Sequence, residues 1–387
     1  MGGGATRAYN VAKGLHLNGC EVQVIAAFPH YPEGNIPREY RWKPFKFEKN
    51  DGMKIIRTFI LPLASRGIAR RLILFLSFIA SSLFVLILVG SYDVVWAANP
   101  NVLSMFPALI YGGIRRRPIA MNVDDLWIGS VYSRSEKSIL MRTFALVSKF
   151  IYSRADLITP ISPGYVNGIH STFNVDVRKI RVIFGGVDLA NFSINIDFMK
   201  TDTELFKILY IGSFSVGYDF DQVLLAAKIL NDVEGIIFVL QGGGELFGYV
   251  WQKSKKLGLK NLKVISKIVS RDEVADILQD ADVLILPLKK YHGPYQGIST
   301  KLYEYQAAGK PIICCSEGMS ERYIAKTKSG VTVKPGDHKK LAKSILWLKN
   351  NPGLMREFGE NGKKYVEKNL SIEVIGYNMK QAFEEII

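Results

Sequence analysis

The sequence predicts an α/β protein made of two doubly wound domains in tandem, whose facing sheets leave a cleft between them. Short apolar runs rich in Val and Ile alternate with helical stretches, which is typical of parallel sheets covered by helices on both faces. The alternation stops at a polar stretch, residues 193–204, and then starts again. A length of 387 residues suits two domains of about 100 to 200 residues each.

In the first half, residues 1–192, six apolar runs are expected to be strands: EVQVIA (21–26), MKIIRTF (53–59), DVVWAA (93–98), PIAMNVD (118–124), DLITPI (156–161) and IRVIFGG (180–186). The stretch at 138–155 has helical periodicity. The chain opens on MGGGATRAYNVAKG, which reads as a glycine loop and a helix. Because such a loop normally follows a strand, the first strand of this domain is missing. Either the start lies downstream of the natural one, or the sheet has lost a strand.

In the second half, residues 205–370, six further runs are expected to be strands: FKILYIGS (206–213), IIFVLQGG (236–243), LKVIS (262–266), VLILPL (283–288), PIICC (311–315) and VTVKPG (331–336). Three helical segments close the chain, and the polar stretch 193–204 is the expected linker. Doubly wound sheets bind ligands beyond the carboxyl ends of their strands. Candidate site residues are therefore sought where these runs end.

The net charge of +15 indicates an anionic partner, which could be a nucleotide, a nucleic acid or a membrane surface. The run at 72–90 is apolar and uncharged over 19 residues, long enough to cross a bilayer. A crossing would place the strands before and after it on opposite sides of the membrane. It is otherwise a buried crossover helix or a helix that rests on a membrane. Arginines at 66, 70, 71 and 115–117 favour the last interpretation.

Cysteine usage and the first residues bear on the compartment. Cys20, Cys314 and Cys315 form no disulfide framework and have no metal-ligand spacing, which fits a reducing cytosol. Met1 leads directly into glycines, so no signal peptide is expected. These features predict a cytoplasmic protein attached peripherally to the inner face of the cell membrane.

The most specific stretch is YQGISTKLYEYQAAGKPIICC (295–315), which reads as loop, helix, glycine, proline and strand. Ser299, Thr300 and Lys301 stand at the helix start, where backbone N–H groups and the helix dipole favour an anion. Glu304 follows one turn later, where its carboxylate could accept from the two hydroxyls of a ribose. Each residue alone would be read as an ordinary surface residue.

This stretch resembles the donor-binding segment of family-4 retaining glycosyltransferases, which have the two-domain, Rossmann-like GT-B fold. Their pattern has two glutamates seven residues apart. The second matches Glu304, whereas the first falls at Gln296, which can hydrogen-bond a sugar but carries no charge. Similar segments are GGGATRAYNVAKGLHLNGCEVQVI (2–25), FPHYPEGNIPREYR (28–41), VDDLW (123–127), VIFGGVDLANF (182–192), LYIGSFSVGYDFD (209–221), VLQGGGE (239–245) and SGVTVKPGD (329–337).

The resemblance implies transfer of a hexose or an N-acetylaminosugar, with retention, from a nucleotide diphosphate sugar such as a UDP-sugar. Gly212 would allow close backbone approach, Glu304 would bind the ribose and Lys301 the diphosphate. Gln296, or Ser299 and Thr300, would touch the sugar. Relatives place an Arg and a Lys after the first glycine turn of the second domain, where this chain has Ser213-Phe-Ser-Val216.

The phosphates would therefore rely on Lys301, the helix start and backbone N–H groups near Gly3 and Gly4, with Arg7 as a further candidate. Asp219-Phe-Asp221 and Asp280-Ala-Asp282 resemble metal motifs of another transferase fold, but they fall at helix ends. No metal or other cofactor is expected, because dipoles and lysine can stabilise the leaving diphosphate.

In the first domain, Asp124 and Asp125 end a predicted strand, and one of them would steady the positive charge of the reacting sugar. His30 would contact the acceptor. The acceptor implied is a glycan on polyprenyl diphosphate, as in O-antigen, colanic-acid or capsule synthesis. The helix at 371–387 would cross back onto the first domain.

Three alternatives remain at this stage. A nucleotide-sugar epimerase of the same fold would need no lipid acceptor. A non-catalytic relative would explain Gln296 and the missing basic pair. A nucleic-acid binder would explain the charge, but no recognition motif accompanies the basic residues, so no nucleic-acid partner is expected.

Overall fold

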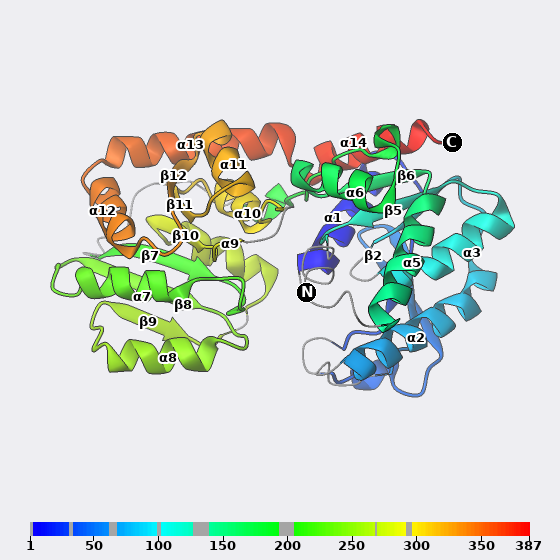
Figure 1. The fold of residues 1–387 in the computed structure, drawn as a ribbon, viewed down its shortest axis with the longest axis horizontal. Helices are drawn as coiled ribbons and strands as arrows, with labels where there is room; N and C mark the ends of the chain where they lie inside the picture. The colour runs from blue at the N-terminus through cyan, green and yellow to red at the C-terminus, as the bar shows by residue number, and fades with distance from the viewer. Residues whose placement is uncertain are drawn as a thin grey trace. The chain divides into compact units, whose positions relative to one another are not determined.

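The computed structural model describes residues 3–30, 34–61, 68–98, 102–126, 139–192, 205–267, 269–291 and 296–387. The chain forms two compact units (Figure 1). The first contains Met1–Gly186, Gly293–Gly297 and Ile372–Ile387, and the second contains Val187–His292 and Ile298–Ser371. The first long stretch of the first unit ends at Gly186, whereas the sequence placed the domain boundary at 192. The expected linker, residues 193–204, lies outside the described residues.

The second unit is built on one sheet of six parallel strands, in the order β12-β11-β10-β7-β8-β9. All six predicted strands are confirmed: β7 (Phe206–Ile211), β8 (Ile236–Gln241), β9 (Leu262–Ile265), β10 (Val283–Pro287), β11 (Ile312–Cys315) and β12 (Gly330–Val333). Its helices are α7 (Phe220–Ile229), α8 (Phe247–Lys256), α9 (Arg271–Gln279), α10 (Lys301–Ala307), α11 (Met319–Thr327), α12 (His338–Lys349) and α13 (Pro352–Asn369). Counted from β9, the order is that of a doubly wound nucleotide-binding sheet.

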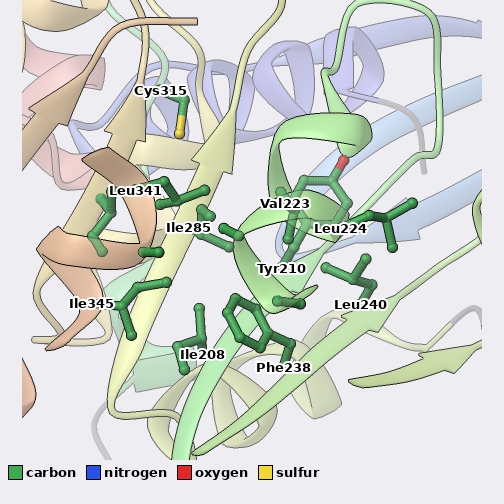
Figure 2. Close-up of a cluster of buried hydrophobic side chains, with 14 of the residues drawn as sticks. Ile208, Tyr210, Val223, Leu224, Phe238, Leu240, Ile285, Cys315, Leu341 and Ile345 are labelled. Carbon is green, nitrogen blue, oxygen red and sulfur yellow. The ribbon is translucent and has the colours of Figure 1, made fainter. Parts of the chain in front are cut away.

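The core of this unit explains why its strands could be found from apolar runs. Side chains of β7, β8 and β10 lie between the sheet and helices α7 and α12 (Figure 2). All five residues of β10 are buried, because helices cover both faces of the sheet. α7 begins after Asp219, whose carboxylate accepts from the Gln222 N–H at 3.1 Å, and α9 begins with a capping box of Ser270 and Glu273.

In its described residues, the first unit contains two three-stranded sheets, ordered β1-β3-β2 and β4-β5-β6. The strands are β1 (Gln23–Ala27), β2 (Phe45–Asn50), β3 (Met53–Thr58), β4 (Val95–Ala97), β5 (Ile119–Val123) and β6 (Leu157–Pro160). Two predictions were incomplete. β2 was missed, because it is a half-exposed strand that pairs antiparallel with β3. The run IRVIFGG forms a single bridge from Ile180 to Ile158 and no strand.

In each three-stranded sheet of the first unit, only the middle strand pairs with strands on both sides within the described residues. β1 bonds only β3, and β4 bonds only β5. Every residue of β1 and β4 is partly exposed, whereas β5 is buried throughout. No described strand precedes α1.

The helices of the first unit are α1 (Gly3–Leu17), α2 (Ile68–Val85), α3 (Phe106–Arg115), α5 (Ile139–Arg154), α6 (Val166–Phe173) and α14 (Ile372–Glu384). α14 packs against α1, and the two are drawn side by side in Figure 1. Gly14 and Gly376 let the backbones meet: a Cβ on Gly14 would lie 2.1 Å from the Ile372 carbonyl oxygen. The end of the chain is therefore part of the first unit.

The apolar run at 72–90 forms most of α2 and a following 3₁₀ turn, Leu86–Leu88. One side of it is buried, with Ser82 and Val85 each 1% exposed. The other side reaches the surface, where Leu76 is 52% and Phe84 57% exposed. The helix is therefore only half covered by its own unit. In the described part of the chain, no helix combines the length and apolarity needed to cross a membrane.

Candidate functional site

Two glycine turns meet at the carboxyl ends of β7 and β8 in the second unit. Gly212, Gly242 and Gly244 have φ values of +145°, +145° and +142°, which side chains with a Cβ rarely adopt. A Cβ on Gly242 would lie 1.8 Å from the Gly212 carbonyl oxygen. The Phe214 N–H donates to the Gly243 carbonyl at 2.8 Å, which joins the two turns. The result is a bare backbone surface where a ligand can approach closely.

Lys301 reaches this surface from α10. Its Nζ donates to the Ile211 carbonyl at 3.2 Å, and a Cβ on Gly212 would lie 2.0 Å from that nitrogen. The ammonium also lies 5.7 Å from the centre of the Tyr210 ring. Burial lowers the pKa of Lys301, and nearby Glu304 raises it in part. The structure thus brings together Gly212 and Lys301, which are 89 positions apart in the sequence.

The neighbours of Lys301 in the sequence stay close to it. Ser299 and Thr300 are partly exposed, and Thr300 stands directly before α10 without a side-chain capping bond. Glu304, also partly exposed, lies in the first turn of this helix. A cation and a carboxylate on one helix, beside two glycine turns, can bind a phosphate and a hydroxyl group respectively.

Gln296 lies in a different unit of the structure from Lys301 and Glu304. It belongs to the short segment assigned to the first unit, where a Cβ on neighbouring Gly297 would lie 2.3 Å from the Tyr165 hydroxyl oxygen. The structure therefore does not bring Gln296 together with Lys301 and Glu304 within one unit. Its proposed contact with the sugar stays a prediction.

Sequence reasoning did not single out Glu245, which closes the second glycine turn. Its Oε1 accepts from the Val216 N–H at 3.2 Å. A carboxylate thus lies beside the position where relatives are expected to carry a basic pair. The signal was present in QGGGE, where the acidic residue directly follows three glycines.

In the first unit, Arg7 lies in a buried ion pair. Its side chain is 2% exposed, and Nη1 lies 2.7 Å from Oδ1 of Asp124, which is 12% exposed. The guanidinium also donates to Asn122 Oδ1 and to the Ile183 carbonyl. Phosphate binding by Arg7 was expected to need a side chain that is accessible to a ligand. The side chain instead points inward, because β5 and the segment at Ile183 offer it acceptors.

Asn122 is a second residue that sequence reasoning missed. It is 0% exposed within the apolar run of β5. A lone amide in such a run needs a hydrogen-bond partner, which Arg7 provides. The expected glycine loop also differs from the structure, because Gly3 and Gly4 form the first turn of α1. A first helical turn tolerates glycine, since its N–H groups have no partner within the helix.

Asp125 and His30 remain nearer the surface. The Asp125 side chain is exposed, and its pKa is raised by partial burial of the carboxylate and by the like charge of Asp124. His30 follows β1, and its Nδ1 lies 2.8 Å from the Phe28 carbonyl oxygen of its own loop. Both residues stand at carboxyl ends of strands, the edge where doubly wound domains bind ligands.

The two Asp-x-Asp segments have local partners. Asp219 caps α7, and Asp221 accepts from the Tyr249 hydroxyl at 2.8 Å. Asp280 pairs with Lys207, whose N–H donates to Asp282 at 2.7 Å. Among the described residues, no group of three or more His, Cys, Asp or Glu side chains could hold a metal ion.

Comparison with known proteins also divides the chain into two parts, with a boundary near residue 192. Residues 1–191 match the model of Glycosyltransferase Family 4, and residues 194–365 match that of Glycosyl transferases group 1. The glycosyltransferase MJ1607 of Methanocaldococcus jannaschii is 23% identical over 96% of this chain and 91% of its own. The D-rhamnosyltransferase WbpZ of Pseudomonas aeruginosa is 25% identical over 56% of each chain.

Solved structures share the fold over almost the whole chain. Sucrose-phosphate synthase of Thermosynechococcus elongatus has a TM-score of 0.76 at 17% identity and matches 99% of this chain and 93% of its own. Anabaena HepE in complex with UDP and glucose has 0.69 at 13% identity, covering 99% and 96%. WaaG, a glycosyltransferase involved in lipopolysaccharide biosynthesis, has 0.67 at 14%, covering 100% and 96%. Since two adjoining family models and these folds agree, this chain belongs to the group 1 glycosyltransferases, with the GT-B fold.

Proposed function

We propose that the protein transfers a sugar, with retention, from a UDP-type nucleotide diphosphate sugar to a lipid-linked glycan. The observation that carries the donor half is the position of Lys301 Nζ beside Gly212 and the Ile211 carbonyl. A diphosphate at the bare glycine turns would meet this ammonium. Glu304, one turn further along α10, is then available to the ribose hydroxyls. UDP is favoured because HepE was solved with UDP and glucose.

The acceptor half rests on the surface of the first unit. Leu72, Leu76 and Phe84 follow one another at helical spacing along the exposed side of α2 and are 40%, 52% and 57% exposed. Beside them lies an apolar hollow of about 480 Å³, lined by Pro44, Phe59, Ser77, Ala80, Ser81 and Phe84. Such a patch suits the hydrocarbon of a membrane or of a lipid carrier.

The positive charge of the first unit also supports a membrane as the partner. The segment before β2 exposes Trp42 fully and Lys43 beside it, a pairing common at membrane interfaces. The residues of the first unit include 24 Lys and Arg against 14 Asp and Glu. We therefore place the protein at an anionic membrane surface, with a polyprenyl-diphosphate glycan as acceptor. WaaG, which shares the fold, is a glycosyltransferase involved in lipopolysaccharide biosynthesis.

Titration calorimetry with UDP, GDP and CDP, with and without magnesium, tests the donor site. We expect one nucleotide, UDP, to bind without the metal. Glu304→Ala should weaken binding by about 10-fold or more, because each ribose hydroxyl bonded to a carboxylate contributes about 1.5–3 kcal/mol. Glu357→Ala, an exposed acid on α13 of the same unit, is the matched control and should bind normally. Equal binding by the Glu304 variant would rule out this donor site.

A further inference from the structure

We infer that Asp125, and not Asp124, presents the reactive carboxylate of the first unit, and that a buried ion pair of Arg7 and Asp124 positions it. This inference rests on the proposed glycosyl transfer and names the residues that serve it. Both aspartates follow β5, at the edge of the sheet where ligands bind. Their surroundings assign them different tasks.

Asp124 is already occupied. Its Oδ1 lies 2.7 Å from Arg7 Nη1, and only 12% of its side chain is exposed. Arg7 in turn is held by Asn122 at the end of β5 and by the Ile183 carbonyl. This set of bonds connects the first turns of α1 to the ends of β5 and the segment at 183. Because Arg7 compensates the negative charge of Asp124, this carboxylate contributes little electrostatic attraction to a substrate. The ion pair instead fixes the position of the chain that follows β5.

Asp125 is the next residue and is exposed. Within the described residues, no hydrogen bond or ion pair holds its carboxylate. The charged groups that face it are Asp124 at the end of β5 and, behind Asp124, Arg7 of α1. Partial burial of its carboxylate raises the pKa of Asp125, and the like charge of Asp124 raises it further. Asp125 is therefore positioned through its neighbour, and its carboxylate makes no bond to another described residue that a ligand would have to displace.

The chemical step needs one such group. The bond from the anomeric carbon to the donor phosphate breaks, a bond from the acceptor oxygen to that carbon forms, and the acceptor proton passes to the leaving diphosphate. Positive charge develops on the sugar while both bonds are long. The Asp125 carboxylate would stabilise that charge without gaining a proton or forming a bond.

Four variants separate the two roles, with kcat and the donor KM measured for each. Asp125→Asn should lower kcat by about 10²–10³-fold and leave the donor KM nearly unchanged. Arg7→Met and Asp124→Asn should each lower kcat and the unfolding temperature, because each leaves one buried charge without its partner. The double variant Arg7→Met/Asp124→Asn removes both charges and should recover much of the unfolding temperature, whereas kcat should stay low because the pair that positions Asp125 is gone. Asp176→Asn, an exposed acid paired with Arg178 in the same unit, is the control and should leave kcat unchanged.

An Asp125→Asn variant with a nearly normal kcat, together with a low kcat for Asp124→Asn, would overturn the assignment in favour of Asp124. Carbon-13 NMR titration of the Asp125 carboxyl adds a readout that needs no substrate. Asp124→Asn should lower the pKa of Asp125, since it removes the like charge, and an unchanged pKa would contradict the coupling. Absence of transfer by the unmodified protein would instead count against the proposed function.

Discussion

At the scale of single residues, the proposed donor site depends on a lysine whose ammonium group is buried against the backbone. Lys301 Nζ lies against the Ile211 carbonyl, where a Cβ on Gly212 would collide with it. Burial lowers its pKa below the ordinary value of 10.5, although Glu304 partly opposes this. The contact between Lys301 and the backbone therefore requires glycine at position 212. Because the pKa of Lys301 is lowered, its ammonium group loses its proton at a lower pH than an exposed lysine does.

Two opposite responses to alkaline pH follow from Lys301. Between its lowered pKa and 10.5, the unfolded chain keeps the proton that the folded chain has lost, so the free energy of unfolding rises with pH in that window. UDP affinity should fall in the same window, because the neutral amine no longer attracts the diphosphate. Urea unfolding and calorimetry across the alkaline range measure both effects, and Lys301→Met should remove both. Affinity that is independent of pH up to 10.5 would contradict the proposed role.

At the scale of elements, the first unit is held together by a close crossing of its first and last helices. α1 and α14 touch through Gly14 and Gly376, whose backbones leave no room for a Cβ. The same unit has open edges at β1 and β4. The contact between α1 and α14 thus joins the two ends of the chain within one unit.

Alanine substitutions at two helical glycines should have opposite effects on stability. Gly14→Ala places a methyl group 2.1 Å from the Ile372 carbonyl oxygen and should lower the free energy of unfolding by about 1–3 kcal/mol. Gly113→Ala in α3 meets nothing within 4 Å and should raise it by about 0.5–1 kcal/mol. Urea denaturation of both variants checks this pair. A Gly14 variant as stable as the parent would mean that α14 does not pack on α1.

At the scale of the whole molecule, charge and apolar surface are unevenly divided between the units. The first unit has an excess of ten positive charges, whereas the second has an excess of five. The half-exposed helix α2 also belongs to the first unit. This division agrees with our proposal that the first unit contacts an anionic membrane and that the second binds the nucleotide.

Sedimentation with lipid vesicles tests this division. The protein should bind vesicles of phosphatidylglycerol more strongly than those of phosphatidylcholine, and salt should weaken binding by screening the charges. Leu76→Glu should reduce binding by several-fold, because it places a charge on the apolar side of α2. Leu17→Glu in α1 is the matched control, since both leucines are 52% exposed. Equal losses in the two variants would contradict docking through α2.

The sequence by itself determined the doubly wound sheet of the second unit, its glycine turns and the approximate positions of most helices. These features can be predicted from short stretches of sequence. Strands buried on both faces consist of continuous apolar residues, and turns with positive φ need glycine at fixed positions. The same local pattern identified Asp124 and Asp125 as residues at the end of a strand, although it could not distinguish their roles.

Only the tertiary structure decided which distant residues meet. Arg7 and Asp124 are 117 positions apart, and their ion pair exists because α1 and β5 pack in one unit. Three further features depend on contacts with distant segments, which a local sequence pattern does not identify. They are the antiparallel pairing of β2, the absence of the strand expected at 180–186 and the crossing of α1 with α14. Burial and pairing energies come from contacts between segments. A sequence therefore indicates which residues can act, and packing decides which of them remain available to a substrate.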